Sequence, residues 1–312
     1  MPKAFLWKDE WCGVTENSIQ VILNADDFGS STDVNAAIAH AYREGALTSA
    51  SLMVAGDAVE EAVALARSMP GLAVGLHVVV VNGKATLPPA EIPHLVDAHG
   101  NFPDNPLSIG LLYALNRAAR DELRRELEAQ FERFAATGLP LSHVDGHLLM
   151  HMHPTVLNLL LPLAERYGAC GLRVPRDELV ASLPYNPPGL GIKIGWAIAF
   201  GLLCRQCLWQ LERRGLGGGE LVVTDRVYGL MQSGHMTEAY VVSVLQRLRL
   251  PTAELYFHPA YGTARQHLGP NPGDLAALTS PQVRQIIQQR NLQLTTYRAL
   301  RKKEIELEKE MR

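Results

Sequence analysis

The stretch IQVILNADDFGSS, residues 19–31, contains the pattern from which the fold is inferred. An apolar run, Val21 to Leu23, precedes two adjacent carboxylates, Asp26 and Asp27, and a Phe-Gly pair follows them. This order is typical of a buried strand whose carboxyl end carries functional side chains. Adjacent like charges at the end of such a strand repel each other, so we expect a cation to offset the repulsion.

Outward from this stretch, strand and helix patterns alternate. Residues 33–45 have helical periodicity, with Asp33 as the expected cap and Gly45 as the stop. Further helices are expected at residues 58–69, 121–138, 154–168 and 280–291, and further strands at residues 48–56, 72–80, 141–147, 171–176, 220–225, 254–259 and 292–297. This alternation predicts an α/β fold in which helices cover a parallel sheet. Seven to eight strands favour a single barrel domain over residues 1–312.

Composition narrows the class of protein. The chain has 312 residues, of which 47% are hydrophobic, which suits one large α/β barrel. Its net charge of −3 gives no reason to expect nucleic acid as a partner. Of four cysteines only Cys204 and Cys207 form a C-x-x-C pair, and no second pair completes a zinc site. Free thiols and the lack of an apolar signal segment at the start predict a cytoplasmic protein.

Three further polar positions fall where strands are expected to end. His77 lies within LAVGLHVVV, His258 within ELYFHPAY, and the segment 143–153 reads HVDGHLLMHMH. Functional side chains of a parallel barrel gather at the carboxyl ends of its strands. Taken singly, a lone histidine is more often a buried structural residue, and a strand-end aspartate such as Asp26 often caps the next helix. These positions taken together are therefore stronger evidence for a functional site than any one of them alone.

The segment 143–153 is the densest of these signals, with four of the chain's 11 histidines. His143, Asp145 and His147 alternate, so a strand would point all three to one face. His147 and His151 are four residues apart and would share a face of a helical turn. One carboxylate with two imidazoles would make an open site for one divalent ion. The second carboxylate of the Asp26–Asp27 pair could then act as a base toward water on that ion.

Four ordered motifs resemble those of a known family. They are NADDFG, the Gly-Leu-His of residues 75–77, HVDGHLLMH and FHPAY, and the likeness runs from about Val21 to Tyr297. Together they are similar to the YdjC-like carbohydrate deacetylases, which include chitooligosaccharide deacetylases. The resemblance implies a distorted TIM-like (β/α) barrel. It also implies a metal-dependent hydrolase that removes acetyl from an N-acetylglucosamine-type sugar.

The resemblance also implies roles for individual residues. By motif match, Asp27, His77 and His147 would bind the divalent ion, Asp26 would be the base, and His258 the acid that protonates the leaving amine. The ligand types suit zinc, and magnesium or manganese remain alternatives.

Other features of the sequence bear on the substrate. Arg173 in LRVPR matches a basic site position, and Asp145 and His151 are expected to contact substrate. SSTDVNAAI, LHVVVVNGK, VDGHLLMHMHP and a long insertion resemble the hopanoid biosynthesis-associated branch of the family. That likeness implies conversion of an N-acetylglucosaminyl hopanoid into a glucosaminyl hopanoid. A soluble chitooligosaccharide remains the alternative substrate.

The insertion, residues 176–220, begins with a Pro/Gly-rich segment and continues as an apolar helix. Trp196, Phe200 and Leu203 share one face of that helix. We expect residues 186–214 to form a lid on the barrel rim, with this face contacting lipid at the inner membrane surface. The alternative is a helix that packs against the barrel or against a second subunit of a homodimer.

Other activities fit the pattern less well. A metal phosphoesterase could use the same ligands, but it would usually need a second metal and a basic clamp. A glycosidase would need two carboxylates about 5–9.5 Å apart across a sugar, whereas Asp26 and Asp27 are adjacent. A non-catalytic lipid carrier would explain the apolar helix but not four polar motifs at strand ends. The phosphoesterase remains open at this point.

Overall fold

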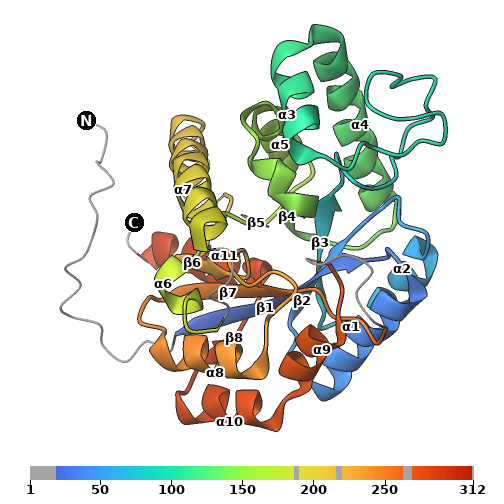
Figure 1. Ribbon diagram of the computed structural model, residues 1–312. Coiled ribbons are helices and arrows are strands. Elements are labelled where there is room, and N and C mark those ends of the chain that lie inside the picture. The colour runs from blue at the N-terminus through green and yellow to red at the C-terminus, as the bar shows by residue number, and fades with distance from the viewer. Residues whose placement is uncertain (1–18, 186–189, 216–219, 263–268, 311–312) are drawn as a thin grey trace.

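A curled parallel sheet forms the centre of the molecule in the computed structural model, which describes residues 19–185, 190–215, 220–262 and 269–310 (Figure 1). Seven strands run in the order β5-β4-β3-β2-β1-β7-β6, and β8 pairs with the start of β1. All of these pairings are parallel. The strands are β1 (Gln20–Phe28), β2 (Ser49–Leu52), β3 (Ala73–Val78), β4 (Leu141–Gly146), β5 (Gly171–Leu172), β6 (Arg226–Tyr228), β7 (Thr252–Phe257) and β8 (Gln293–Leu294). The expected distorted (β/α) barrel is confirmed.

The two edges of the sheet approach each other through irregular backbone. Val222 forms a single parallel bridge with Gly171 of β5. The Leu172 amide donates to the Val222 carbonyl at 3.0 Å, and the Val227 amide of β6 donates to the Arg176 carbonyl at 3.4 Å. The strand expected at residues 220–225 was therefore wrong, because this segment contributes one bridge rather than a ladder.

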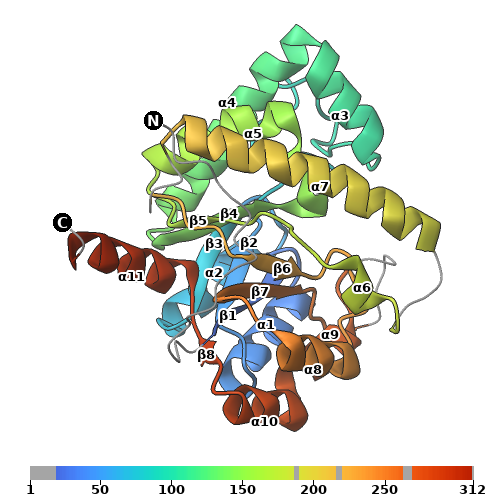
Figure 2. The same ribbon diagram turned by 90° about the vertical axis from the view of Figure 1, so that its left-hand side faces the viewer.

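Helices surround the sheet (Figures 1 and 2). They are α1 (Thr32–Glu44), α2 (Val59–Ser68), α3 (Pro106–Leu115), α4 (Arg117–Ala136), α5 (Pro154–Arg166), α6 (Leu179–Ser182), α7 (Leu190–Arg213), α8 (Glu238–Arg247), α9 (Pro272–Thr279), α10 (Pro281–Gln289) and α11 (Tyr297–Glu310), with the 3-10 helix η1 (His147–Met152) after β4. Helix α1 ends at Gly45 as expected, but its cap is Ser31 rather than Asp33. The reason is that Ser31 keeps an extended backbone and accepts the Val34 amide, whereas Asp33 already lies in the first turn.

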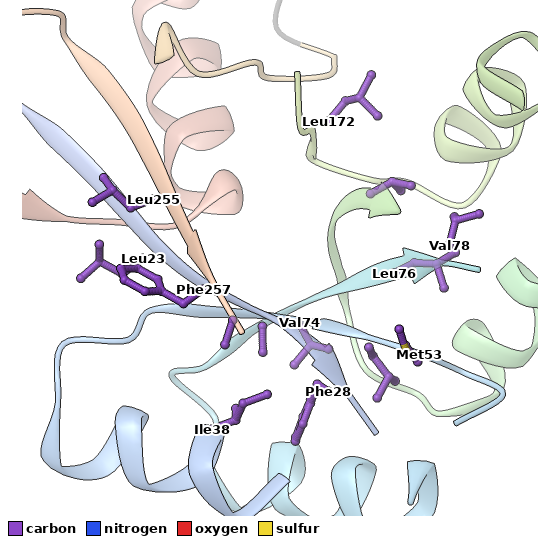
Figure 3. Packing of buried hydrophobic residues seen from close by; sticks show 14 of the residues in the cluster. Leu23, Phe28, Ile38, Met53, Val74, Leu76, Val78, Leu172, Leu255 and Phe257 are labelled. Carbon is purple, nitrogen blue, oxygen red and sulfur yellow. The ribbon is translucent and has the colours of Figure 1, made fainter. Parts of the chain in front are cut away.

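The two faces of β1 have different environments, and this difference positions the site. Val21, Leu23 and Ala25 belong to the large apolar core beneath the helices. Figure 3 shows Phe28 and Ile38 in this layer, between the strands and α1. The alternate residues point into the barrel, where Ile22 packs with Tyr297, while Asn24 and Asp26 hydrogen-bond to other buried side chains. The barrel interior is therefore polar at the end where β1 stops.

The insertion supplies α6 and α7 between β5 and β6. The inner side of α7 packs against the barrel rim, where Trp196 and Phe200 lie against Leu149 of η1 and against Met231. Within the described residues, one helix, Gly191–Arg213, is long and apolar enough to cross a membrane by length and composition alone. Because its inner side packs on other parts of the chain, composition does not by itself indicate a span.

Candidate active site

A backbone irregularity at the end of β1 separates the two adjacent carboxylates. The register of β1 against β2 shifts between Ala25 and Phe28, and Asp27 has a φ of 62°. This left-handed conformation is uncommon for a residue other than glycine, and such outliers cluster at functional sites. Asp26 contacts Arg173, whereas Asp27 contacts His77 and His147.

Asp27 and two imidazoles form the first group. Asp27 Oδ1 lies 3.4 Å from His77 Nε2 and 3.2 Å from His147 Nδ1, and one ligand atom from each residue lies within 4.8 Å of the others. Asp27 and His77 are buried, while 13% of the His147 side chain is exposed. Burial alone would raise the pKa of the Asp27 carboxyl, but His147 and His77 outweigh it and hold this pKa well below its usual range.

His77 is oriented from behind by Asp145. The Asp145 Oδ1 atom lies 2.8 Å from His77 Nδ1. Among the described residues, the other ring nitrogen, Nε2, is buried and has no hydrogen-bond partner. Burial disfavours a charge on this ring, but Asp145 and Asp27 outweigh it and raise the pKa of His77 to about 10. A carboxylate hydrogen-bonded to one ring nitrogen, with the second nitrogen facing another candidate ligand, here Asp27, is the arrangement of histidines that bind metals.

These three residues fit a divalent ion. Two imidazole nitrogens and one carboxylate provide three protein ligands, and the exposed edge at His147 leaves a direction from which water or substrate can complete the coordination. The cluster could therefore hold one metal ion, whose identity the ligand types do not decide.

Asp26 belongs to a second, deeper group centred on Arg173. The guanidinium makes two hydrogen bonds to Asp26, from Nη1 to Oδ2 at 2.7 Å and from Nη2 to Oδ1 at 2.8 Å. It also contacts Asp145 at 2.8 Å and donates from Nε to Glu254 at 2.9 Å. Burial alone would lower the pKa of Arg173, but the three carboxylates raise it well above its usual range. Arg173 therefore supplies the positive charge that offsets the carboxylates at this depth.

The aromatic and small residues around Arg173 complete its surroundings. The guanidinium lies over the Tyr256 ring, 4.4 Å from the ring centroid. The Tyr297 hydroxyl donates to Glu254 Oε2 at 2.5 Å. Gly171 is needed at its position, because a Cβ there would lie 2.1 Å from the Tyr297 ring. These contacts fix the orientation of the charged group.

A neutral network links the two groups. The Ser51 hydroxyl donates to Asp145 Oδ2 at 2.7 Å and lies 3.0 Å from His143 Nε2. The Asn24 amide donates both to Ser51 Oγ at 2.8 Å and to Asp26 Oδ1 at 2.9 Å. Gly75 accommodates the His143 ring, since a Cβ at that position would lie 2.4 Å from it. Displacement of one member would thus disturb both carboxylates.

His258 lies at the mouth of the site, just after β7. Its Nε2 atom is 3.9 Å from Asp26 Oδ2, and 11% of its side chain is exposed. Its backbone amide donates to Asp274 Oδ2 at 2.8 Å, which fixes the backbone after the strand. His258 and His147 therefore lie at the exposed edge, one beside each member of the aspartate pair.

The structure brings together the five residues with predicted metal or catalytic roles: Asp26, Asp27, His77, His147 and His258. The three residues expected to contact substrate, Arg173, Asp145 and His151, have no exposed surface. His151 does not converge with His147, because Leu148 and Leu149 between them have positive φ. Its Nε2 instead lies 2.9 Å from the Arg173 carbonyl oxygen. In this arrangement these three residues contact other buried groups of the site.

Sequence reasoning missed Asn24, Ser51, Glu254 and the two tyrosines beside Arg173. Asn24 stands within the NADD motif, and Glu254 is an acidic residue in an apolar strand, so both carried a signal. Ser51 carried no such signal in the sequence, because its two partners, His143 and Asp145, lie 92 and 94 positions further along the chain.

Comparison with known proteins agrees with the motifs and the fold. The family model described as YdjC-like protein matches residues 20–289. The chain belongs to the YdjC-like family. It is 32% identical over 291 residues to a carbohydrate deacetylase of Brevibacillus brevis, covering 90% of this chain and 100% of that protein. It is 36% identical over 159 residues to a chitooligosaccharide deacetylase of Serratia marcescens, covering 51% of this chain and 60% of that protein.

A solved structure resembles the fold of this family member. It is a putative cellobiose-phosphate cleavage protein of Enterococcus faecalis, with a TM-score of 0.69 and 23% identity, and the match covers 91% of this chain and 99% of that one. The predicted family membership is thus confirmed, while the likeness to the hopanoid branch stays a prediction.

Proposed function

We propose that this chain is a carbohydrate N-deacetylase that hydrolyses the acetamido group of an N-acetylglucosamine-type sugar, with one divalent ion held by Asp27, His77 and His147. The observation that carries the proposal is the division of the aspartate pair, with Asp27 beside two imidazoles and Asp26 on the Arg173 guanidinium. The likeness to carbohydrate deacetylases over 90% of the chain supports this reaction class. Amide hydrolysis needs a nucleophile, a stabilised oxyanion and a protonated leaving nitrogen, and the site has residues suited to each.

The bound ion would polarise the acetyl carbonyl and lower the pKa of a water molecule toward about 7. Asp26 would accept the proton of that water, and two observations support this role: it is adjacent to Asp27, and the Arg173 guanidinium fixes its orientation. The water oxygen would then bond to the acetyl carbon. Asp145 and Ser51 would take no direct part in the reaction. Asp145 holds His77, while Ser51 donates to Asp145 and accepts a hydrogen bond from Asn24, which also donates to Asp26.

His258 would act as the acid. It lies at the exposed edge, with Nε2 3.9 Å from Asp26 Oδ2, so both groups can face one bound acetamide. When the bond between the acetyl carbon and nitrogen breaks, His258 would deliver a proton to the departing amine. The products are acetate and a free amino sugar, which balances the water consumed.

We further propose a lipid-linked amidosugar as the substrate, with an N-acetylglucosaminyl hopanoid as the specific candidate and peripheral contact with the inner membrane. The apolar composition of α7 beside η1, which carries His147, supports a substrate with an apolar part. A lid role would require movement of α7, because Trp196, Phe200 and Leu203 are partly buried and pack inward. Soluble chitooligosaccharides are the second candidate, since relatives include chitooligosaccharide deacetylases.

The test is acetate release, with and without a chelator, from matched lipid-linked and soluble N-acetylglucosamine substrates. The proposal expects chelator-sensitive acetate from the lipid-linked substrate in excess of the soluble one. Phosphate release from phosphorylated sugars would instead favour a phosphoesterase. That alternative is weakened because Arg173, the arginine of the described site, is buried on three carboxylates and not directed at a phosphate.

A further inference from the structure

Helix α3 exposes a stripe of leucines. Leu107, Leu111 and Leu115 are spaced at i, i+4 and i+8, and their exposed fractions are 78%, 62% and 79%. The opposite side of the same helix is buried, with Tyr113 donating its hydroxyl proton to the Val80 carbonyl. The leucines are therefore not needed to hold α3 on the barrel. Three large apolar side chains on one helical face are unusual on a surface without a partner.

Helix α7 exposes a comparable stripe on its outer side. Ile198 and Leu202 are each 63% exposed, and Trp209 further along the same face is 53% exposed. Arg213 stacks on Trp209, with the guanidinium carbon 4.7 Å from the ring centroid. Arg205 is also exposed on this face. A large aromatic side chain next to arginines is typical of helices that lie in a membrane interface.

Both helices border the segment that carries His147. The inner side of α3 contacts η1 and the residue after it, with Gly110 beside Met150 and His153, and the inner side of α7 packs on Leu149. Both helices stand at the upper end of the molecule in Figures 1 and 2. Because η1 begins with His147, a surface bound by both helices would lie next to the candidate metal ligands.

Basic residues adjoin the leucine stripe. Leu111, Leu115 and Arg117 line one hollow, and Arg117, Arg120 and Arg124 line the next, which contains one acidic residue, Asp121. This excess of arginine complements anionic headgroups. A second copy of the chain is less suitable as the occupant, since a two-fold interface places the same patch on both sides and adds arginines to arginines.

We propose that α3 and α7 form a docking face for a bilayer that contains anionic phospholipid. The leucine and isoleucine stripes enter the interface, and the arginines of α4 and α7 meet the headgroups. The docked protein holds η1 and the candidate ligands near the surface, where a lipid-linked sugar would be found. Only the biological purpose of this docking rests on the proposed function, because binding to vesicles does not require catalysis.

The test is co-sedimentation of the full chain with phosphatidylcholine vesicles, with and without phosphatidylglycerol. The intact protein should bind the anionic vesicles, and added salt should weaken binding. Two double variants should each lower binding by about tenfold or more. One is Leu107→Glu with Leu111→Glu in α3, and the other is Ile198→Glu with Leu202→Glu in α7. Arg117→Gln with Arg120→Gln should lower binding to anionic vesicles only. Leu307→Glu, at an exposed leucine of α11, is the matched control and should bind normally.

Two further measurements keep the result decisive. The double variants should keep the unfolding temperature of the intact protein. They should also release acetate from a soluble acetylated amino sugar at the rate of the intact protein, so a failure of the proposed catalysis can be distinguished from a failure of the docking proposal. The proposal is overturned if the intact protein does not bind anionic vesicles or if the leucine variants bind as well as Leu307→Glu. It is also overturned if the intact protein is a dimer that the same variants dissociate without a change in vesicle binding.

Discussion

Arg173 holds Asp26 through two parallel hydrogen bonds of 2.7 and 2.8 Å, deep inside the barrel. The repulsion expected between Asp26 and Asp27 is therefore offset on one side by a cation that the chain itself provides. Asp27 is directed away by its positive φ and meets two imidazoles instead. This division explains how adjacent carboxylates can have different tasks in one reaction.

Arg173 should be essential for stability. Arg173→Met leaves Asp26, Asp145 and Glu254 buried without their cation, and breaking a buried charge network of this kind costs about 3–5 kcal/mol. Chemical denaturation should show this loss in the free energy of unfolding. The control is Arg166→Met, which removes a solvent-exposed pair with Glu128 and should change the free energy of unfolding far less. Similar costs for the two variants would contradict the role given to Arg173.

Asp145 should influence metal binding rather than substrate contact. Asp145→Asn weakens the hold on His77 Nδ1, and loss of such a partner typically lowers metal affinity by about 10–100-fold. Zinc titration with a competing chelator measures this affinity. At saturating metal, the KM for the sugar should stay close to that of the intact enzyme. A raised KM with unchanged metal affinity would instead support the substrate-contact role predicted from the sequence.

His258→Ala should slow departure of the amine. The expected decrease in kcat is about 10²–10⁴-fold for an acetylated amino sugar, and smaller for an activated anilide whose leaving group needs no proton. Metal content, measured by inductively coupled plasma mass spectrometry, should not change, because His258 is outside the ligand cluster. An equal loss for both substrates would exclude His258 as the acid.

Metal binding should release a proton. Without metal, the raised pKa of about 10 keeps His77 protonated at neutral pH, and Nε2 must lose its proton to become a ligand. Metal affinity should therefore rise with pH until about pH 10. In the metal-free protein, the same raised pKa favours folding below pH 6.5 and this contribution fades as pH rises toward 10. Calorimetry in buffers of different ionisation enthalpy counts the released protons, and none released would contradict the assignment.

Strong periodicity made much of the fold predictable. The helix expected at residues 121–138 is α4, with Leu123, Leu127 and Phe131 buried as the 3.6-residue period requires. Ser280 caps α10 through its hydroxyl, as its position before Pro281 suggested. Helix α3 was missed, because PLSIGLLYAL is apolar on nearly every side and has no clear period.

The site was predictable to the extent that its residues follow strands. Asp26, Asp27, His77 and His258 lie at the ends of β1, β3 and β7, where a parallel barrel places functional groups. The pairing of Arg173 with Glu254 was not predictable, because it joins residues 81 positions apart in the sequence and across the barrel in space. The positive φ of Asp27 likewise has no pattern in the sequence, although it decides which carboxylate meets which partner.

The division of the aspartate pair is tested most directly by comparing Asp26→Asn with Asp27→Asn for both bound metal and acetate release. Asp26→Asn should keep one ion per chain and lose about 10²–10⁴-fold in kcat, because the amide cannot accept the water proton. Asp27→Asn should lose both the ion and the activity, because the amide oxygen is a weaker, uncharged ligand. Equal metal content in the two variants, or near-normal turnover by Asp26→Asn, would contradict this division.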